Sequence, residues 1–80
     1  MSSFQIPWDS PASLISWGPL PAQRFTVRGA VRTWLKFSVQ DQGLAEMITE
    51  LSFSVEPGGA EKTVFDASDL ARLSELLPVK

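Results

Sequence analysis

The sequence contains no cysteine and no histidine. Without cysteine, no disulfide can compensate for a small core, and a thiolate metal or redox site is excluded. Without histidine, the chain lacks the commonest general base and the usual zinc ligand. It also lacks the Gly-Lys-Ser/Thr sequence of a phosphate loop and the Gly-x-Ser-x-Gly sequence of a hydrolase nucleophile. We therefore expect a protein that is not an enzyme and that binds no cofactor and no metal.

Long apolar runs are absent too, as is a basic N-terminal region followed by an apolar stretch. A membrane-spanning helix needs about 20 apolar residues, and a secretory signal needs that basic start. We therefore expect a cytoplasmic protein without a membrane segment. The 80 residues, of which 44% are hydrophobic, suit a single domain, residues 1–80, with a small core.

The charges are unevenly distributed along the chain. Residues 1–40 carry four basic residues and one acidic residue, whereas residues 41–80 carry three basic and eight acidic residues. Such a division can be neutralised within the fold, so it does not by itself indicate an external partner.

The N-terminal segment, residues 1–23, is rich in proline and tryptophan. Within it, Ser10 can cap a helix, Pro11 suits the first helical position, and Gly18 followed by proline can end it. These signals predict a short helix over residues 11–17. Because so short a helix needs tertiary contacts, we expect the segment to dock on the rest of the fold. The alternative is a linear peptide that docks on another protein.

The longest patterned stretch covers residues 24–39 and reads RFTVRGAVRTWLKFSV. Alternate positions are apolar, which predicts a strand with one buried face. A helix is the alternative, because basic residues recur at every fourth position and some apolar residues also fit a helical stripe. The β-branched and aromatic content favours the strand, since a helix would leave Phe25 and Phe37 off its apolar stripe.

The second half of the chain indicates two more strands. Residues 41–43, Asp-Gln-Gly, suit a three-residue hairpin loop, which would pair the first strand with a second over residues 45–55. A short helix over residues 44–51 is the alternative, because its apolar residues are also helically spaced. A turn at Pro57-Gly58-Gly59 then precedes a third strand over residues 61–65.

The C-terminal region predicts a helix over residues 67–77, with Asp66 as its cap, Asp69 in its first turn and leucines along one side. The expected fold class is therefore α+β. It comprises an antiparallel β-meander of three strands, about 24–39, 45–55 and 61–65, with the C-terminal helix on one face and the short N-terminal helix at 11–17.

The polar face of the first strand is the candidate functional surface. It combines cationic side chains with one large aromatic: Arg24, Arg28, Arg32, Trp34 and Lys36. Arginine and tryptophan are enriched at interface hot spots. The alternative is a purely structural role, in which the N-terminal segment covers Trp34 and glutamates neutralise the arginines.

A non-catalytic protein–protein interaction module is the function that we expect. It would be a small inhibitor or accessory protein that binds a larger protein through this cationic face and an exposed strand edge. The unpaired strand end at residues 24–28 could also form a homodimer. Single-stranded nucleic-acid binding is an alternative, but the acidic balance of the chain makes nucleic acid the weaker candidate. A self-assembling structural component is a third hypothesis.

Overall fold

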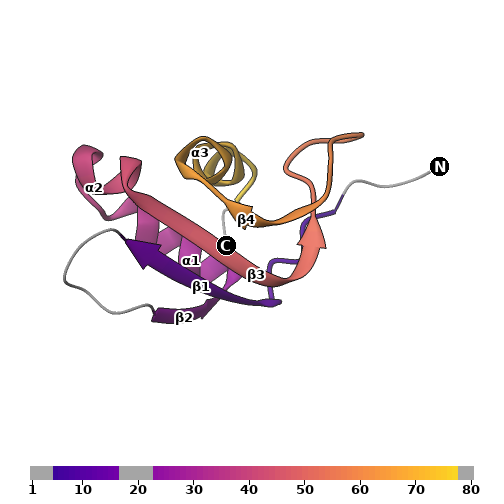
Figure 1. Cartoon of the computed structure of the whole chain (residues 1–80), viewed down its shortest axis with the longest axis horizontal. Helices are drawn as coiled ribbons and strands as arrows, with labels where there is room; N and C mark the ends of the chain where they lie inside the picture. Colours follow the sequence, from indigo (N-terminus) through magenta and orange to yellow (C-terminus); the bar gives the residue numbers. More distant parts are fainter. Residues whose placement is uncertain (1–4, 17–22, 78–80) are drawn as a thin grey trace.

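The computed structural model describes residues 5–16 and 23–77 of the chain. The elements, in chain order, are β1 (Pro11–Ser16), β2 (Gln23–Thr26), α1 (Val27–Leu35), α2 (Val39–Gly43), β3 (Ala45–Phe53), β4 (Lys62–Phe65) and α3 (Ala67–Leu76). The fold is α+β, with an antiparallel sheet and a C-terminal helix (Figure 1). This confirms the expected fold class, although the sheet has four strands rather than three.

The strands lie in the order β2-β1-β3-β4, and each neighbouring pair is antiparallel. The first strand in the chain, β1, is therefore an inner strand of the sheet. Its residue Ala12 lies opposite Phe25 of β2 and opposite Thr49 of β3, while Met47 of β3 lies opposite Phe65 of β4. The strands β2 and β4 form the two edges.

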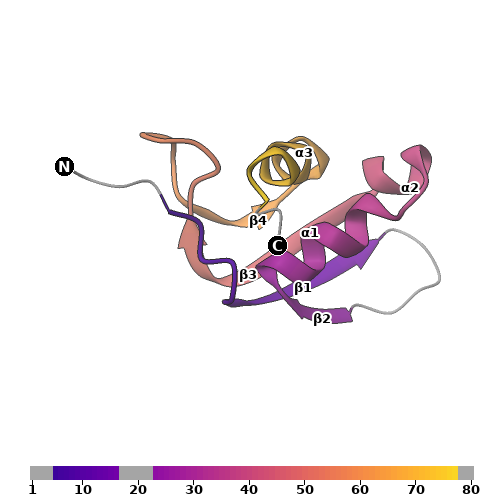
Figure 2. The same cartoon turned by 180° about the vertical axis from the view of Figure 1, so that it is seen from behind.

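The two longer helices cover the same face of the sheet. Helix α1 packs on β1, β2 and β3, and α3 packs on β3, β4 and α1. In Figure 1 α1 lies behind β1 and β3, and in Figure 2, seen from behind, it lies in front of them. Between these layers lies a core that the hydrophobic effect stabilises. Its buried residues are Ala12, Leu14, Val27, Ala30, Val31, Trp34, Ala45, Met47, Phe53, Phe65, Leu70 and Leu73.

The C-terminal helix, expected over residues 67–77, is α3, and its start follows the predicted chemistry. The side chain of Asp66 accepts a hydrogen bond from the main-chain N–H of Asp69 at 3.0 Å, and the side chain of Asp69 accepts one from the N–H of Asp66 at 3.2 Å. This reciprocal capping box satisfies two main-chain donors that the helix cannot satisfy itself.

The helix expected over residues 11–17 is wrong, because residues 11–16 form strand β1. Buried Ala12 and Leu14 alternate with more exposed neighbours, which is the period of a strand. A single helical turn would leave most main-chain N–H and C=O groups of residues 11–16 without a hydrogen bond. As a strand between β2 and β3, the segment forms hydrogen bonds with a neighbour on each side.

The N-terminal segment, residues 1–23, therefore supplies a strand of the sheet in addition to contacts against it. Ile6 and Trp8 are partly buried against the core, and the main-chain oxygen of Trp8 accepts a hydrogen bond from the N–H of Arg28 at 2.9 Å. The part of the expected helix at residue 17, and residues 1–4 and 18–22, lie outside the described residues.

The long strand expected over residues 24–39 is also wrong. Only its first residues are extended, as the end of β2, and the chain then forms α1 from Val27 and α2 from Val39. The four-residue spacing of the basic side chains is thus the spacing of a helix. Phe25 precedes α1 and Phe37 follows it, so neither has to fit the apolar stripe of the helix.

Thr26 supplies the local signal that starts α1. Its side chain accepts a hydrogen bond from the main-chain N–H of Gly29 at 3.1 Å, and its backbone is still extended. Threonine at this position satisfies a donor that would otherwise lack a partner. Burial of Val27, Val31 and Trp34 against the sheet then overrides the β-propensity of the same side chains.

The hairpin loop expected at residues 41–43 is also wrong, because the long strand that it would have joined to the second strand does not form. These residues lie in α2, so β3 pairs with β1 and β4 instead of with residues 24–39. The second and third strands are confirmed as β3 and β4, which excludes the helix considered for residues 44–51. The turn before β4 is confirmed by Gly58, whose φ is +77°.

Candidate protein-binding surface

Helix α1 places three predicted site residues in one row. Arg28 and Arg32 lie in α1 and Lys36 is its C-cap; the three are spaced by four residues, so their side chains lie on the same side of the helix. The opposite side carries buried Val27, Ala30, Val31 and Trp34. We call the row Arg28, Arg32 and Lys36 the cationic stripe; it lies on a helix and not on the strand face expected from the sequence.

Acidic side chains neutralise little of the charge of the cationic stripe within the described part of the chain. Helix α1 contains no acidic residue, and the ion pairs among the described residues include Arg28 but neither Arg32 nor Lys36. Like charges at i and i+4 destabilise a helix by about 0.2–0.5 kcal/mol per pair. The stripe contains two such pairs, so its charge is not optimal for stability.

Arg28 differs from the other two members because it is partly buried. Its guanidinium lies 3.8 Å from the carboxylate of Asp9, which is itself highly exposed, so this pair contributes little. Its Nε atom is buried without a hydrogen-bond partner among the described residues. A cation in the first turn also opposes the helix dipole.

Leu35 adjoins the cationic stripe and was missed as a surface residue. It lies three residues after Arg32, on the neighbouring side of α1, and 46% of it is exposed. In the strand prediction Leu35 belonged to the buried face. The helical alternative counted Leu35 with Val27, Val31 and Trp34 in the apolar stripe, so neither interpretation placed it at the surface.

Trp34 does not belong to the candidate surface, because it is 5% exposed. Its indole Nε1 donates a hydrogen bond to the main-chain oxygen of Gln42 in α2 at 3.0 Å. The expected combination of arginines and an exposed tryptophan is therefore not present. Trp34 lies on the side of α1 that packs on the sheet, and the inner strand β1 of that sheet comes from the N-terminal segment. Helix α2 adds the hydrogen bond to the indole.

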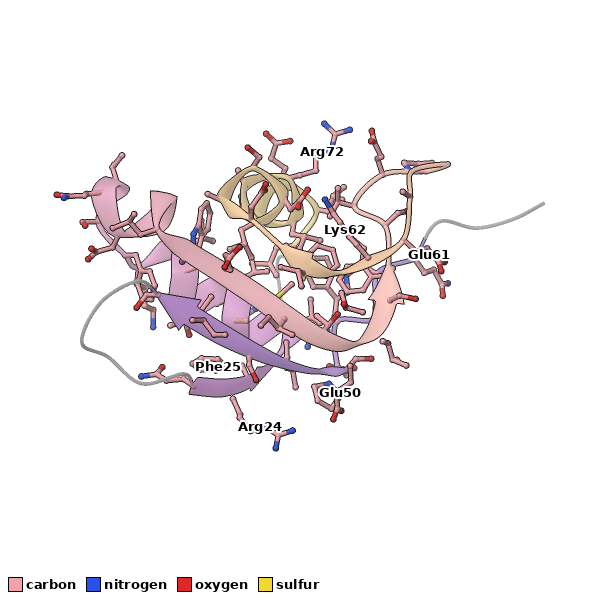
Figure 3. All side chains as sticks on the ribbon, viewed as in Figure 1. Arg24, Phe25, Glu50, Glu61, Lys62 and Arg72 are labelled. Carbon is pink, nitrogen blue, oxygen red and sulfur yellow. The ribbon has the colours of Figure 1, made fainter. Side chains whose placement is uncertain are left out.

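Arg24, the fifth predicted residue, lies on β2 and away from α1. Register places it opposite Ser13 of β1, on the sheet face that the helices do not cover. Its guanidinium is 3.9 Å from the carboxylate of Glu50, and these side chains are 77% and 66% exposed. Figure 3 shows both at the β2 side of the sheet. This exposed pair is weak, so Arg24 remains accessible to other anions.

The same open face carries apolar side chains at its centre. Ile48 lies opposite Ser13 of β1 and opposite Val64 of β4, and both Ile48 and Val64 are exposed. Ile15, two residues along β1, is half-buried. In Figure 1 this face of β1 and β3 is turned toward the viewer.

A separate pocket of about 400 Å³ is lined by Gln5, Ile6, Trp8 and Leu76, and none of the predicted site residues lines it. Among residues 5–16 and 23–77, no group of three or more acidic, histidine or cysteine side chains is arranged to hold a metal ion. Nor does any helix in those ranges have the length and apolar character needed to cross a membrane.

No protein-family model matches the chain, and neither the curated proteins nor the solved structures include a match.

Proposed function

We propose that this protein is a non-catalytic protein-binding module, a small inhibitor or accessory protein that binds an acidic surface of a larger protein through the cationic stripe. The observation that carries the proposal is the row Arg28, Arg32 and Lys36 on one side of α1, without an acidic residue in the helix. The absence of histidine and cysteine from the sequence supports a binding role over a catalytic one.

Helix stability alone does not account for the whole stripe. Arg32 and Lys36 lie near the C-terminal end of α1, where cations interact favourably with the helix dipole. Arg28 lies in the first turn, where the dipole disfavours it, and it repels Arg32 one turn away. A carboxylate on a partner would reverse this unfavourable balance, which is why we assign the stripe to binding.

The partner that fits best is a protein. Single-stranded nucleic acid is usually held by aromatic stacking as well as charge, but Trp34 is buried. The chain as a whole is also acidic, with a net charge of −2, so a polyanion would meet repulsion outside the stripe. A localised carboxylate cluster on a protein avoids that repulsion. A cytoplasmic location belongs to this same proposal.

The test compares two charge reversals on different helices. Tagged wild-type protein, the double variant Arg32→Glu/Lys36→Glu and the control Arg72→Glu of exposed Arg72 in α3 are used to capture proteins from the source cells. Captured proteins are quantified by mass spectrometry, and binding is then measured with the purified partner. Circular dichroism establishes that each variant is folded.

We expect the double variant to bind the partner about tenfold or more weakly and the Arg72→Glu control to bind like wild type. Affinity should also fall as salt rises. Equal capture by all three proteins would contradict the proposal. Capture of oligonucleotides instead of a protein, lost in the double variant, would support the nucleic-acid alternative and contradict the protein-binding one.

A further inference from the structure

The edge strand β2 offers main-chain hydrogen bonds to another strand. The N–H of Val27 donates to the oxygen of Ser10 at 2.9 Å, which continues the register that places Ala12 opposite Phe25. Hydrogen-bonded pairs alternate along an antiparallel ladder. The N–H and C=O of Arg24 and the N–H of Thr26, between those pairs, therefore point away from β1 toward the free edge. The C=O of Thr26 accepts the first hydrogen bond of α1, because Thr26 is its N-cap.

No described element lies beyond β2. Figures 1 and 2 both show β2 at the margin of the sheet, whereas α3 lies beside β4 at the opposite margin. Exposed edges are commonly protected by proline, a bulge or a charge. The four residues of β2, QRFT, include only the charge of Arg24 for this purpose. The edge is therefore short but accessible.

The side chains of β2 define what kind of strand fits. Arg24 projects on the open face of the sheet, and opposite charges that face each other on neighbouring strands attract each other. Phe25 points to the helix-covered face, where it is half-buried against the core. A matching strand would place a carboxylate beside Arg24 and an apolar residue beside Phe25, in the alternation that a strand provides.

A second copy of this chain fits the edge poorly. Pairing β2 with itself around Arg24 would set two guanidinium groups directly opposite each other, which destabilises a sheet. Pairing around Phe25 would place the two Arg24 side chains diagonally on the same face. Both arrangements bring together like charges, so charge complementarity favours a different chain over the expected homodimer.

We infer that β2 binds an extended segment of a partner protein with alternating acidic and apolar residues, which adds to the sheet as a fifth strand. This inference rests on the proposed function, because it describes how a protein partner would be held. The acidic side chains would pair with Arg24, and main-chain hydrogen bonds with Arg24 and Thr26 would fix the direction and register.

A synthetic peptide and three variants test the inference. The probe is a fluorescein-labelled peptide of about ten residues with alternating glutamate and valine, long enough to span β2; a lysine–valine peptide is its control. Arg24→Pro removes the outward N–H without affecting the bonds to β1, Arg24→Gln keeps that N–H but removes the charge, and Arg24→Glu reverses the charge.

We expect saturable binding of the acidic peptide, measured by fluorescence anisotropy, and NMR shifts centred on the amides of Arg24 and Thr26. Arg24→Pro should weaken binding about tenfold or more, and Arg24→Gln by a few-fold. Arg24→Glu should favour the lysine–valine peptide. Absence of shifts at these amides, or equal binding by Arg24→Pro, would overturn the inference.

Light scattering distinguishes the homodimer. A dimer that forms at high protein concentration and is abolished by Arg24→Pro would mean that a second copy occupies β2, which overturns the inference. The two proposals can also fail separately. If Arg32→Glu/Lys36→Glu loses the cellular partner but Arg24→Pro retains it, the cationic stripe is the binding surface and the β2 inference is wrong.

Discussion

The indole Nε1 of Trp34 donates a hydrogen bond to the main-chain oxygen of Gln42 at 3.0 Å, and the side-chain amide of Gln42 donates one to the main-chain oxygen of Trp34 at 3.2 Å. This reciprocal pair joins the end of α1 to α2. It also leaves the polar atoms of a largely buried tryptophan satisfied, as buried polar groups require.

Trp34→Phe should therefore lower the free energy of unfolding by about 1–3 kcal/mol, because the indole donor and part of the core volume are lost. Urea denaturation followed by fluorescence of the remaining tryptophans or by circular dichroism measures the change. The control Gln42→Ala removes only the second hydrogen bond and should cost about 0.5–1.5 kcal/mol. An unchanged unfolding midpoint for Trp34→Phe would contradict the role assigned to the indole.

The ion pair of Lys62 with Asp69 should stabilise the contact between β4 and α3. Its atoms Nζ and Oδ2 are 2.6 Å apart, and the side chain of Asp69 is only 13% exposed. Asp69→Asn keeps an acceptor for the N–H of Asp66 but removes the charge, and should cost about 1 kcal/mol after allowance for the exposure of Lys62. Asp69→Ala also removes the capping acceptor and should cost about 2 kcal/mol.

High salt separates the two contributions of Asp69 in the same denaturation experiment. Screening should reduce the difference between wild type and Asp69→Asn, while the difference between Asp69→Asn and Asp69→Ala should persist. Equal stability of the two variants would show that the side chain of Asp69 does not cap α3.

Thr26→Ala should destabilise the protein by about 1 kcal/mol, because it removes the side-chain acceptor for the N–H of Gly29 at the start of α1. Thr26→Ser, which retains that acceptor, is the matched control and should lie close to wild type. Thermal unfolding by circular dichroism checks both variants. Identical losses in the serine and alanine variants would assign the effect to the methyl group instead.

Arg28→Glu should raise the free energy of unfolding by about 0.5–1 kcal/mol at low salt. A carboxylate in the first turn suits the helix dipole, and it attracts Arg32 where Arg28 repels it. These gains should exceed the loss of the weak pair with highly exposed Asp9. Denaturation at low and high salt measures the gain, which should shrink with screening. A loss of stability would mean that Arg28 is present for structure, and would weaken the argument that the cationic stripe is kept for binding.

Several features of the fold follow from local sequence signals. The end of α3 nearest Asp66, the strands β3 and β4, and the turn at Gly58 were predictable because capping residues, alternation and glycine act within a few residues of each other. For the candidate surface, the sequence identified the basic residues of α1 but placed them on the wrong type of element.

The stretch 24–39 shows why prediction failed there. Its apolar residues satisfy both a strand period and a helical period, so local pattern could not choose between them. Packing made the choice: α1 buries Val27, Val31 and Trp34 against a sheet whose inner strand β1 comes from the N-terminal segment. The alternation of apolar residues in 24–39 therefore cannot distinguish a strand from a helix. The choice requires knowing that Ala12 and Leu14 occupy the inner strand of the sheet.

By itself, the sequence determined the α+β class, the C-terminal helix and the charge division, because composition and short-range capping are independent of the rest of the fold. Tertiary structure alone decided that Arg28 and Arg32 lie on a helix with Lys36 as its C-cap, that Trp34 is buried, and that the strand of Arg24 pairs with β1. The physical reason is that each depends on which distant segments supply the neighbouring surface, and burial against those segments outweighs local propensity.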